Sequence, residues 1–146
     1  MTHRGYGIFS ILILIGAWLA ALIVIIVRAP VWGIVYALVL ILSGAAVLYF
    51  YCARCPAKKV CPYVIPCKVA ALMPGRMVSS YSVWETGAFI LGTGVPIVFP
   101  VALLWPHRLE LSMYILLILL AAIGIRFKVC PDCKNVYCFM KPRKNS

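Results

Sequence analysis

Four cysteines of this chain stand in two Cys-x-x-Cys pairs, Cys52 with Cys55 and Cys130 with Cys133. A pair at this spacing fits around one metal ion, and two such pairs complete a tetrahedral site of four thiolates. Each pair directly follows a long apolar run of the sequence. If the two runs cross a membrane in the same direction, the four thiols emerge on one face. We therefore predict a thiolate metal site that joins the ends of these two runs.

Three further cysteines leave the pairing open. Cys61 and Cys67 complete an alternative four-thiolate site with Cys52 and Cys55, all within one loop. Cys138 then joins the second pair, which takes its fourth ligand from elsewhere. His3 is the only histidine on the same side, and seven cysteines plus His3 are enough ligands for two four-coordinate sites.

The ligand type narrows the choice of metal. Sites of four thiolates, or of three thiolates and one imidazole, most often hold structural zinc, and thiolates flanked by proline also hold iron–sulfur clusters. Proline adjoins Cys55, Cys61, Cys67 and Cys130 in this chain. Calcium and magnesium are excluded because both prefer oxygen ligands. We predict zinc, with an iron–sulfur cluster as the alternative.

The second pair has a further likeness to known metal sites. Cys130-Pro131-Asp132-Cys133 resembles the metal knuckles of rubredoxins and zinc ribbons. The resemblance is confined to this short motif, and the motif lacks the glycine expected just after the second thiol. It implies a metal-binding knuckle and no wider family membership.

The elements that must position these thiols are membrane helices. The chain has 146 residues, of which 65% are hydrophobic and 12% charged, whereas soluble domains are about half apolar and about a quarter charged. Crossing a hydrocarbon core takes about 20 helical residues. Four runs are long enough: residues 8–27, 31–51, 84–105 and 109–127. Because backbone groups in lipid must be hydrogen-bonded within their segment, we predict one all-α membrane domain of four helices in two antiparallel hairpins.

The cationic side chains predict the orientation, because Lys and Arg accumulate in short cytoplasmic loops. Only Arg28 and Arg108 fall on the far side; the other twelve cations are Arg4, Arg54, Lys58, Lys59, Lys68, Arg76, Arg126, Lys128, Lys134, Lys141, Arg143 and Lys144. Both termini, the Cys-rich loop 52–83 and the Cys-rich tail 128–146 are therefore predicted to face the cytoplasm. Thiols stay reduced in that compartment and serve as metal ligands more often than as disulfides.

The net charge of +11 suits anionic lipid headgroups, and nucleic-acid binding is not expected, because no aromatic-rich soluble module accompanies the charge.

Polar and small residues near the runs have expected structural roles. Residues 43–46, Ser-Gly-Ala-Ala, are expected to let another helix approach closely. Pro96 and Pro100 free backbone carbonyls and kink the third run, and we favour packing over an ion path there. Glu85 is expected to pair with a nearby Lys or Arg and not to relay protons. A short amphipathic helix within residues 64–77 is expected to lie in the membrane interface.

Two residues of the far side have ordinary expected roles. Glu110 opens the fourth run, where an acid complements the positive end of the helix dipole. His107 precedes it in the short turn and is expected to be a solvated interface histidine.

The motifs favour a binding or structural role over catalysis. The chain has no Ser/His/Asp or Cys/His constellation and no Gly-rich phosphate loop. We predict an accessory subunit of a larger membrane complex, in which metal clamps the second and fourth runs together. The alternative is an iron–sulfur subunit that passes electrons from a soluble donor to a quinone. Metal transport ranks lower, because Met113 is the only soft ligand within the runs. Thiol–disulfide exchange would use Cys52 and Cys55 and would leave Cys130 and Cys133 dispensable.

Overall fold

The computed structural model describes residues 3–55, 64–72 and 81–131. Within these ranges the elements are helical and there is no strand. Two of the helical segments, η1 and η3, are π-helical. In chain order the elements are α1 (His3–Arg28), α2 (Pro30–Ala46), η1 (Val47–Cys52), α3 (Val64–Leu72), α4 (Val83–Leu104), α5 (Arg108–Gly124) and η3 (Ile125–Val129).

Four helices are long and apolar enough to cross a membrane. They are Gly5–Arg28, Pro30–Cys52, Val83–Leu104 and Arg108–Val129. Each predicted run lies along one of these helices, with ends that differ by no more than three residues. The predicted all-α architecture with four helices of membrane-spanning length is therefore confirmed for the described part of the chain.

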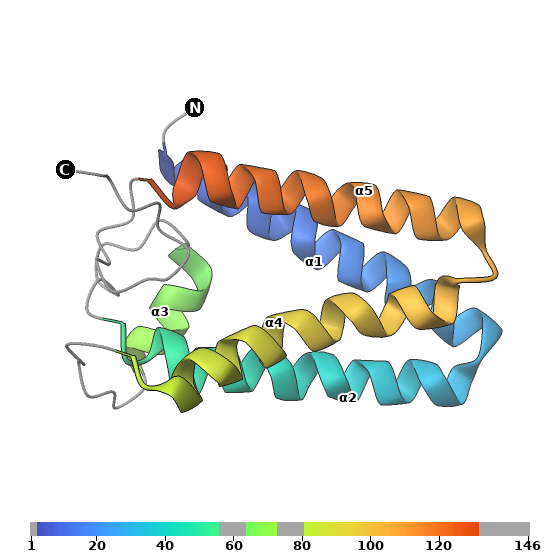
Figure 1. Cartoon of the computed structure of the whole chain (residues 1–146), viewed down its shortest axis with the longest axis horizontal. Coiled ribbons are helices and arrows are strands. Elements are labelled where there is room, and N and C mark those ends of the chain that lie inside the picture. The colour runs from blue at the N-terminus through green and yellow to red at the C-terminus, as the bar shows by residue number, and fades with distance from the viewer. Residues whose placement is uncertain (1–2, 56–63, 73–80, 132–146) are drawn as a thin grey trace.

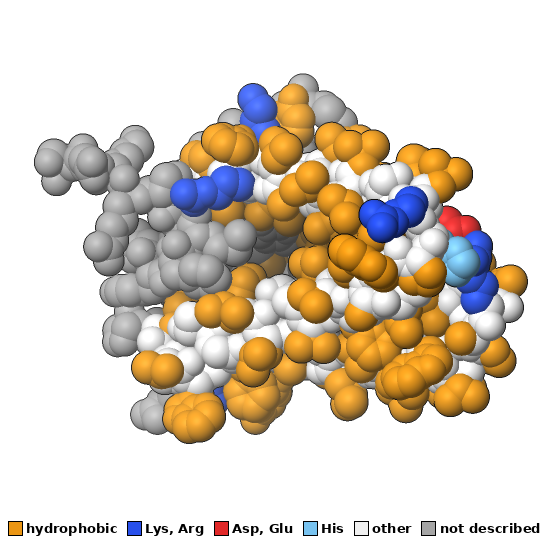
Figure 2. Space-filling view, turned by 45° about the vertical axis from the view of Figure 1, so that its right-hand side comes forward, with side chains coloured by type: hydrophobic (Ala, Val, Ile, Leu, Met, Phe, Trp, Pro, Cys, Tyr) orange, Lys and Arg blue, Asp and Glu red, His pale blue; other side chains and the backbone are white. Residues whose placement is uncertain are grey.

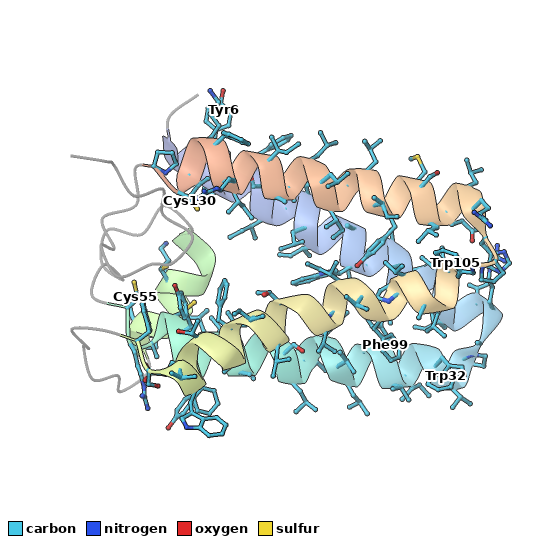
Figure 3. All side chains as sticks on the ribbon, in the orientation of Figure 1. Tyr6, Trp32, Cys55, Phe99, Trp105 and Cys130 are labelled. Atoms are coloured by element: carbon cyan, nitrogen blue, oxygen red, sulfur yellow. The ribbon has the colours of Figure 1, made fainter. Side chains whose placement is uncertain are left out.

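The helices form two layers of a bundle. α1 packs most extensively against α5, and α2 packs most extensively against α4. Figure 1 shows both turns, between α1 and α2 and between α4 and α5, at one end of the bundle, and the start of α1 and the end of η3 at the other. We call the first end the turn end. The second end carries Cys55 and Cys130 and is called the thiol end (Figure 3).

The two hairpins share one register, because positions 78 apart in the sequence have equivalent places in the fold. Pro30 and Arg108 begin the returning helices α2 and α5. The two main interfaces are equivalent in the same way. In each, the first helix of one hairpin packs on the second helix of the other, α1 on α5 and α4 on α2. The other equivalent pairs are Tyr36 with Tyr114, Val47 with Ile125 at the starts of η1 and η3, and Cys52 with Cys130.

A buried cluster near the turn end joins the two layers. Its members are Ala17, Ala21, Ile25, Tyr36, Leu104, Leu111 and Tyr114. Within it, the hydroxyls of Tyr36 and Tyr114 donate to the carbonyl of Pro96 at 3.1 and 3.2 Å. Pro100 has no N–H, so this carbonyl lacks its usual helical partner four residues on. Hydroxyls from two neighbouring helices thus satisfy a carbonyl that would otherwise be orphaned within a span.

Small residues bring the described helices together at three places. The first is Gly33 of α2, where an added Cβ would lie 2.9 Å from Ile26 Cα of α1. A Cβ on Gly92 of α4 would lie 2.8 Å from Val47 Cγ2 and 3.3 Å from the carbonyl oxygen of Ser43. A Cβ on Gly124 of α5 would lie 2.5 Å from the hydroxyl oxygen of Ser10 on α1. The predicted close approach at residues 43–46 is therefore right for Ser43. It is wrong for Gly44, whose added Cβ would meet nothing within 4 Å, because that face of α2 points away from α4.

The outside of the bundle is apolar. Large side chains such as Leu12 and Ile23 on α1, Leu42 on α2 and Val98 on α4 are each more than half exposed. Figure 2 shows hydrophobic side chains over most of the visible face of the helices. Such a surface is compatible with contact to a lipid bilayer.

Candidate thiol site

Four of the seven cysteines belong to the described residues: Cys52, Cys55, Cys67 and Cys130. Cys61, Cys133 and Cys138 lie outside them, as does the rest of the tail from residue 132 onward. Cys55 and Cys130 both lie at the thiol end of the bundle (Figure 3). The two Cys-x-x-Cys motifs therefore begin at the same end, which is what a shared inner face requires.

The first thiol pair stands on a tight turn. The π-helical segment η1 ends at Cys52, and the N–H of Ala53 donates to the carbonyl of Leu48 at 2.8 Å. The N–H of Cys55 then donates to the carbonyl of Cys52 at 3.2 Å. Both cysteines are half-buried. The motif is thus folded back on itself at the point where the helix stops.

A π-helical turn precedes each thiol pair. The sequence predicts ordinary helix up to the thiols, whereas η1 and η3 both form backbone hydrogen bonds between residues five apart. A π turn holds an extra residue and so rotates everything after it around the helix axis. π-helical turns are rare and frequently occur at functional sites. The two π-helical segments stand at equivalent positions of the two hairpins, one ending at Cys52 and the other at Val129, next to Cys130.

An ion pair ties the first thiol turn to the other hairpin. Arg54, between the two cysteines, donates to Glu85 Oε1 at the start of α4. Glu85 is only 4% exposed and also accepts from the N–H of Ser82 at 2.8 Å. In return the Ser82 hydroxyl accepts from the N–H of Glu85, which completes a capping box. The predicted pairing of Glu85 with a nearby cation is confirmed, and the cation is Arg54.

Aromatic and small side chains hold the same turn from the other side. Tyr51, directly before Cys52, stacks on Tyr81 with ring centroids 4.3 Å apart and also lies 4.4 Å from the ring of Phe89. Ala53 is 3% exposed. Tyr51 before Cys52 is therefore packed against Phe89 of α4 and against Tyr81 just before α4, and Ala53 after Cys52 is buried.

The second thiol motif begins in a comparable place on the other layer. Cys130 is buried, and its N–H donates to the carbonyl of Ile125 at 2.8 Å. Val129 before it is fully buried, as η3 packs against α1 and α5. Lys128 places its ammonium 5.9 Å from the ring centroid of Tyr6 on α1.

The short helix α3 brings a third thiol region to the thiol end. It lies within the predicted range 64–77 and packs against η1 and α1, with Cys67 and Ala70 buried and Lys68 and Leu72 exposed. Its placement in the membrane interface stays a prediction. Cys67 is disulfide-bonded in the structure. A sulfur in a disulfide is not a thiolate ligand, so the predicted role of Cys67 in a metal site applies to the reduced protein.

Among the described residues, no three His, Cys, Asp or Glu side chains come together as a metal-binding group. Three thiols of the shared arrangement, Cys52, Cys55 and Cys130, are among the described residues, and they are not gathered as a metal-binding group. The fourth, Cys133, lies outside the described residues, as does Cys61 of the loop arrangement. Both metal arrangements stay predictions.

A second group of charged and polar side chains lies at the turn end of the bundle. Arg28 at the end of α1 forms an ion pair with Glu110 in the first turn of α5 at 2.5 Å, and its guanidinium lies 2.6 Å from Nδ1 of His107. Figure 2 shows this group of basic, acidic and histidine side chains side by side. The Arg28–His107 contact is exposed, which agrees with the expectation of a solvated His107. The contact with Arg28 itself was not predicted, and it forms because the two turns lie close together. Glu110 does open α5 as predicted, and it also serves as the partner of Arg28.

Three of these features were not predicted from the sequence. Arg54 was expected only to set the topology, Tyr36 and Tyr114 had no expected role, and the repeat of the hairpin was not predicted. The equal spacing of the tyrosines and of the two thiol pairs was visible in the sequence and could have indicated the repeat.

Comparison of the chain with protein-family models, with curated proteins and with solved structures finds no match.

Proposed function

We propose that this chain is a small integral membrane protein that binds metal through cysteine thiolates at its thiol end. The site holds zinc and fixes the inner ends of α2 and α5 relative to each other. In this proposal the thiol end faces the cytoplasm, and the protein serves as an accessory subunit of a larger membrane complex.

One observation carries the proposal. Both Cys-x-x-Cys motifs follow a π-helical turn of equal register at the same end of one bundle. Two thiol pairs presented in this way supply the four ligands of a tetrahedral site. A pair of unrelated buried cysteines would need neither the repeated spacing nor the repeated turn.

The setting of the thiols supports a metal over inert cysteines. The cations Arg54 and Lys128 lie within two residues of Cys52 and Cys130. Cations this close to the thiols would offset part of the negative charge that a site of four thiolates carries. A metal bridge between the two layers would strengthen an end of the bundle where the main buried cluster does not reach.

The test is the metal content of the purified full-length chain, kept under reductant. We expect about one or two zinc ions per chain for one or two four-coordinate sites, and a colourless protein. Bound iron with visible absorption would instead favour the electron-transfer subunit. Absence of both metals from the reduced protein would overturn the proposal.

Two paired variants then separate the arrangements. If the thiol pairs share one site, Cys52→Ser with Cys55→Ser removes all the metal, and so does Cys130→Ser with Cys133→Ser. If each pair belongs to its own site, each double variant loses part of the metal and keeps the rest. Thiol–disulfide exchange without metal predicts instead that only the Cys52→Ser, Cys55→Ser variant loses the exchange activity, and that the Cys130→Ser, Cys133→Ser variant keeps it.

A further inference from the structure

The Arg54–Glu85 ion pair occupies an unusual place, since it joins the middle of a thiol motif to a different hairpin. Arg54 stands between Cys52 and Cys55, whereas Glu85 belongs to the capping box of α4. α4 is far from the thiol turn along the chain, since it begins at Val83. The direction in which this turn points therefore depends on contacts that α4 supplies.

Glu85 is held firmly enough to act as an anchor. Its carboxylate is 4% exposed and accepts from both Arg54 and the backbone N–H of Ser82. Its own N–H donates to Ser82 at 3.3 Å. The Ser82 N–H holds the buried carboxylate independently of Arg54, so the carboxylate gives the Arg54 guanidinium a fixed partner.

The stack of Tyr51 on Tyr81 adds a second fixed point before Cys52. Between these two points only Cys52 and Ala53 remain, and Ala53 is buried. The backbone of the thiol turn is thus held on both sides of the first sulfur.

We infer that Glu85 and Arg54 are positioning residues for the first thiol pair, and that α4 thereby sets the geometry in which Cys52 and Cys55 bind metal. This inference rests on the proposed function. Groups that orient metal ligands without touching the metal typically change affinity by about 10- to 100-fold when replaced. The ion pair acts through the backbone turn, so its effect lies at the lower end of that range.

The test compares the two ion pairs of the chain. Glu85→Gln removes the charge beside the thiols, and Glu110→Gln makes the same change at the turn end, far from them. We expect Glu85→Gln to weaken zinc binding about 10-fold, and Glu110→Gln to leave it unchanged. Zinc affinity is measured on the full-length protein by competition with a chelator of known affinity.

Two further variants keep the test sound if Glu85→Gln folds poorly. Arg54→Gln breaks the same ion pair but leaves the capping box in place, and it should match Glu85→Gln in affinity. Arg54→Lys keeps a cation opposite Glu85 and should restore most of the affinity. The double variant of Glu85→Gln with Arg54→Gln should be no weaker than either single variant, because both break one interaction.

A second measurement needs no metal. In the reduced, metal-free protein, the alkylation rates of Cys52 and Cys55 by a maleimide are followed by mass spectrometry. We expect both rates to rise severalfold in Glu85→Gln, because loss of the ion pair loosens the turn and exposes the two thiols more often. Rates and affinities equal to those of Glu110→Gln would overturn the inference. A wild-type protein that binds no metal, with the rate difference retained, would instead refute only the proposed function.

Discussion

The hairpin of α1 and α2 and the hairpin of α4 and α5 both start at the thiol end, turn at the opposite end and return into a π-helical turn before a thiol pair. Equivalent positions stand 78 residues apart throughout. The returning helices are the more alike, since both carry the buried tyrosine and the Cys-x-x-Cys motif. The outgoing helices α1 and α4 differ more, and they supply what is particular to each half.

The outgoing helices α1 and α4 differ in two of the polar groups that they contribute to the bundle. Pro96 on α4 offers the carbonyl to which both tyrosines donate. The equivalent position on α1 is Trp18, whose indole Nε1 has no hydrogen-bond partner among the described residues. Near the thiol end, α4 contributes Glu85, which holds Arg54. The repeat thus sets where the helices and thiols lie, and α4 adds the polar contacts that fix one half of the structure.

The largest effect should come from filling the glycine contact in either interface. Gly92→Leu pushes against Val47 and the Ser43 backbone, and Gly124→Leu pushes against Ser10. We expect each to lower the free energy of unfolding by about 1–3 kcal/mol, measured by SDS titration in detergent.

Gly94→Leu is the matched control for these variants, because an added Cβ there meets nothing within 4 Å. It should change the unfolding free energy by less than about 0.5 kcal/mol. Equal losses at all three glycines would mean that helix approach does not decide the two interfaces.

A smaller effect should follow from the shared carbonyl. Tyr36→Phe and Tyr114→Phe each remove one hydroxyl from Pro96, and each should cost about 0.6 kcal/mol, the mean for hydrogen bonds between membrane helices. The double variant should cost more than the sum, because the carbonyl then has no partner. Strictly additive losses in a double-mutant cycle would show that the two bonds are independent.

The smallest effect should come from the turn end. Arg28→Gln removes an ion pair whose side chains are 41% and 33% exposed. Because exposed ion pairs are screened by solvent, we expect a loss of only a few tenths of a kcal/mol. The loss should shrink further in high salt. A loss as large as that of the glycine variants would mean that the two turns, and not the helix interfaces, hold the bundle together.

The extent of each helix was predictable because it depends on local information. A run of about 20 apolar residues has no stable arrangement in lipid other than a helix, and cations mark where the runs stop. It was predictable that Glu85 pairs with some cation, because a carboxylate at the end of a long apolar helix is costly unless a positive charge neutralises it. The identity of the cation was not, because several Lys and Arg residues share the same loop.

The placement of the thiol motifs at one end also followed from the sequence, since two long helices, α4 and α5, separate them along the chain. The assignment of Cys61, Cys67 and Cys138 to particular sites did not follow. Spacing along the chain gives several pairings of similar quality, and only the folding of residues far apart in sequence distinguishes them.

The sequence by itself determined that this protein is a bundle of membrane-length helices with Cys55 and Cys130 at one end, because hydrophobic length and backbone hydrogen bonding act within each segment. Only the tertiary structure decided that α1 lies on α5 and α2 on α4, that Arg54 meets Glu85, and that two tyrosines share the carbonyl of Pro96. These contacts depend on which helix faces lie together. Helices that are apolar on every side leave that choice to small residues and to a few polar groups.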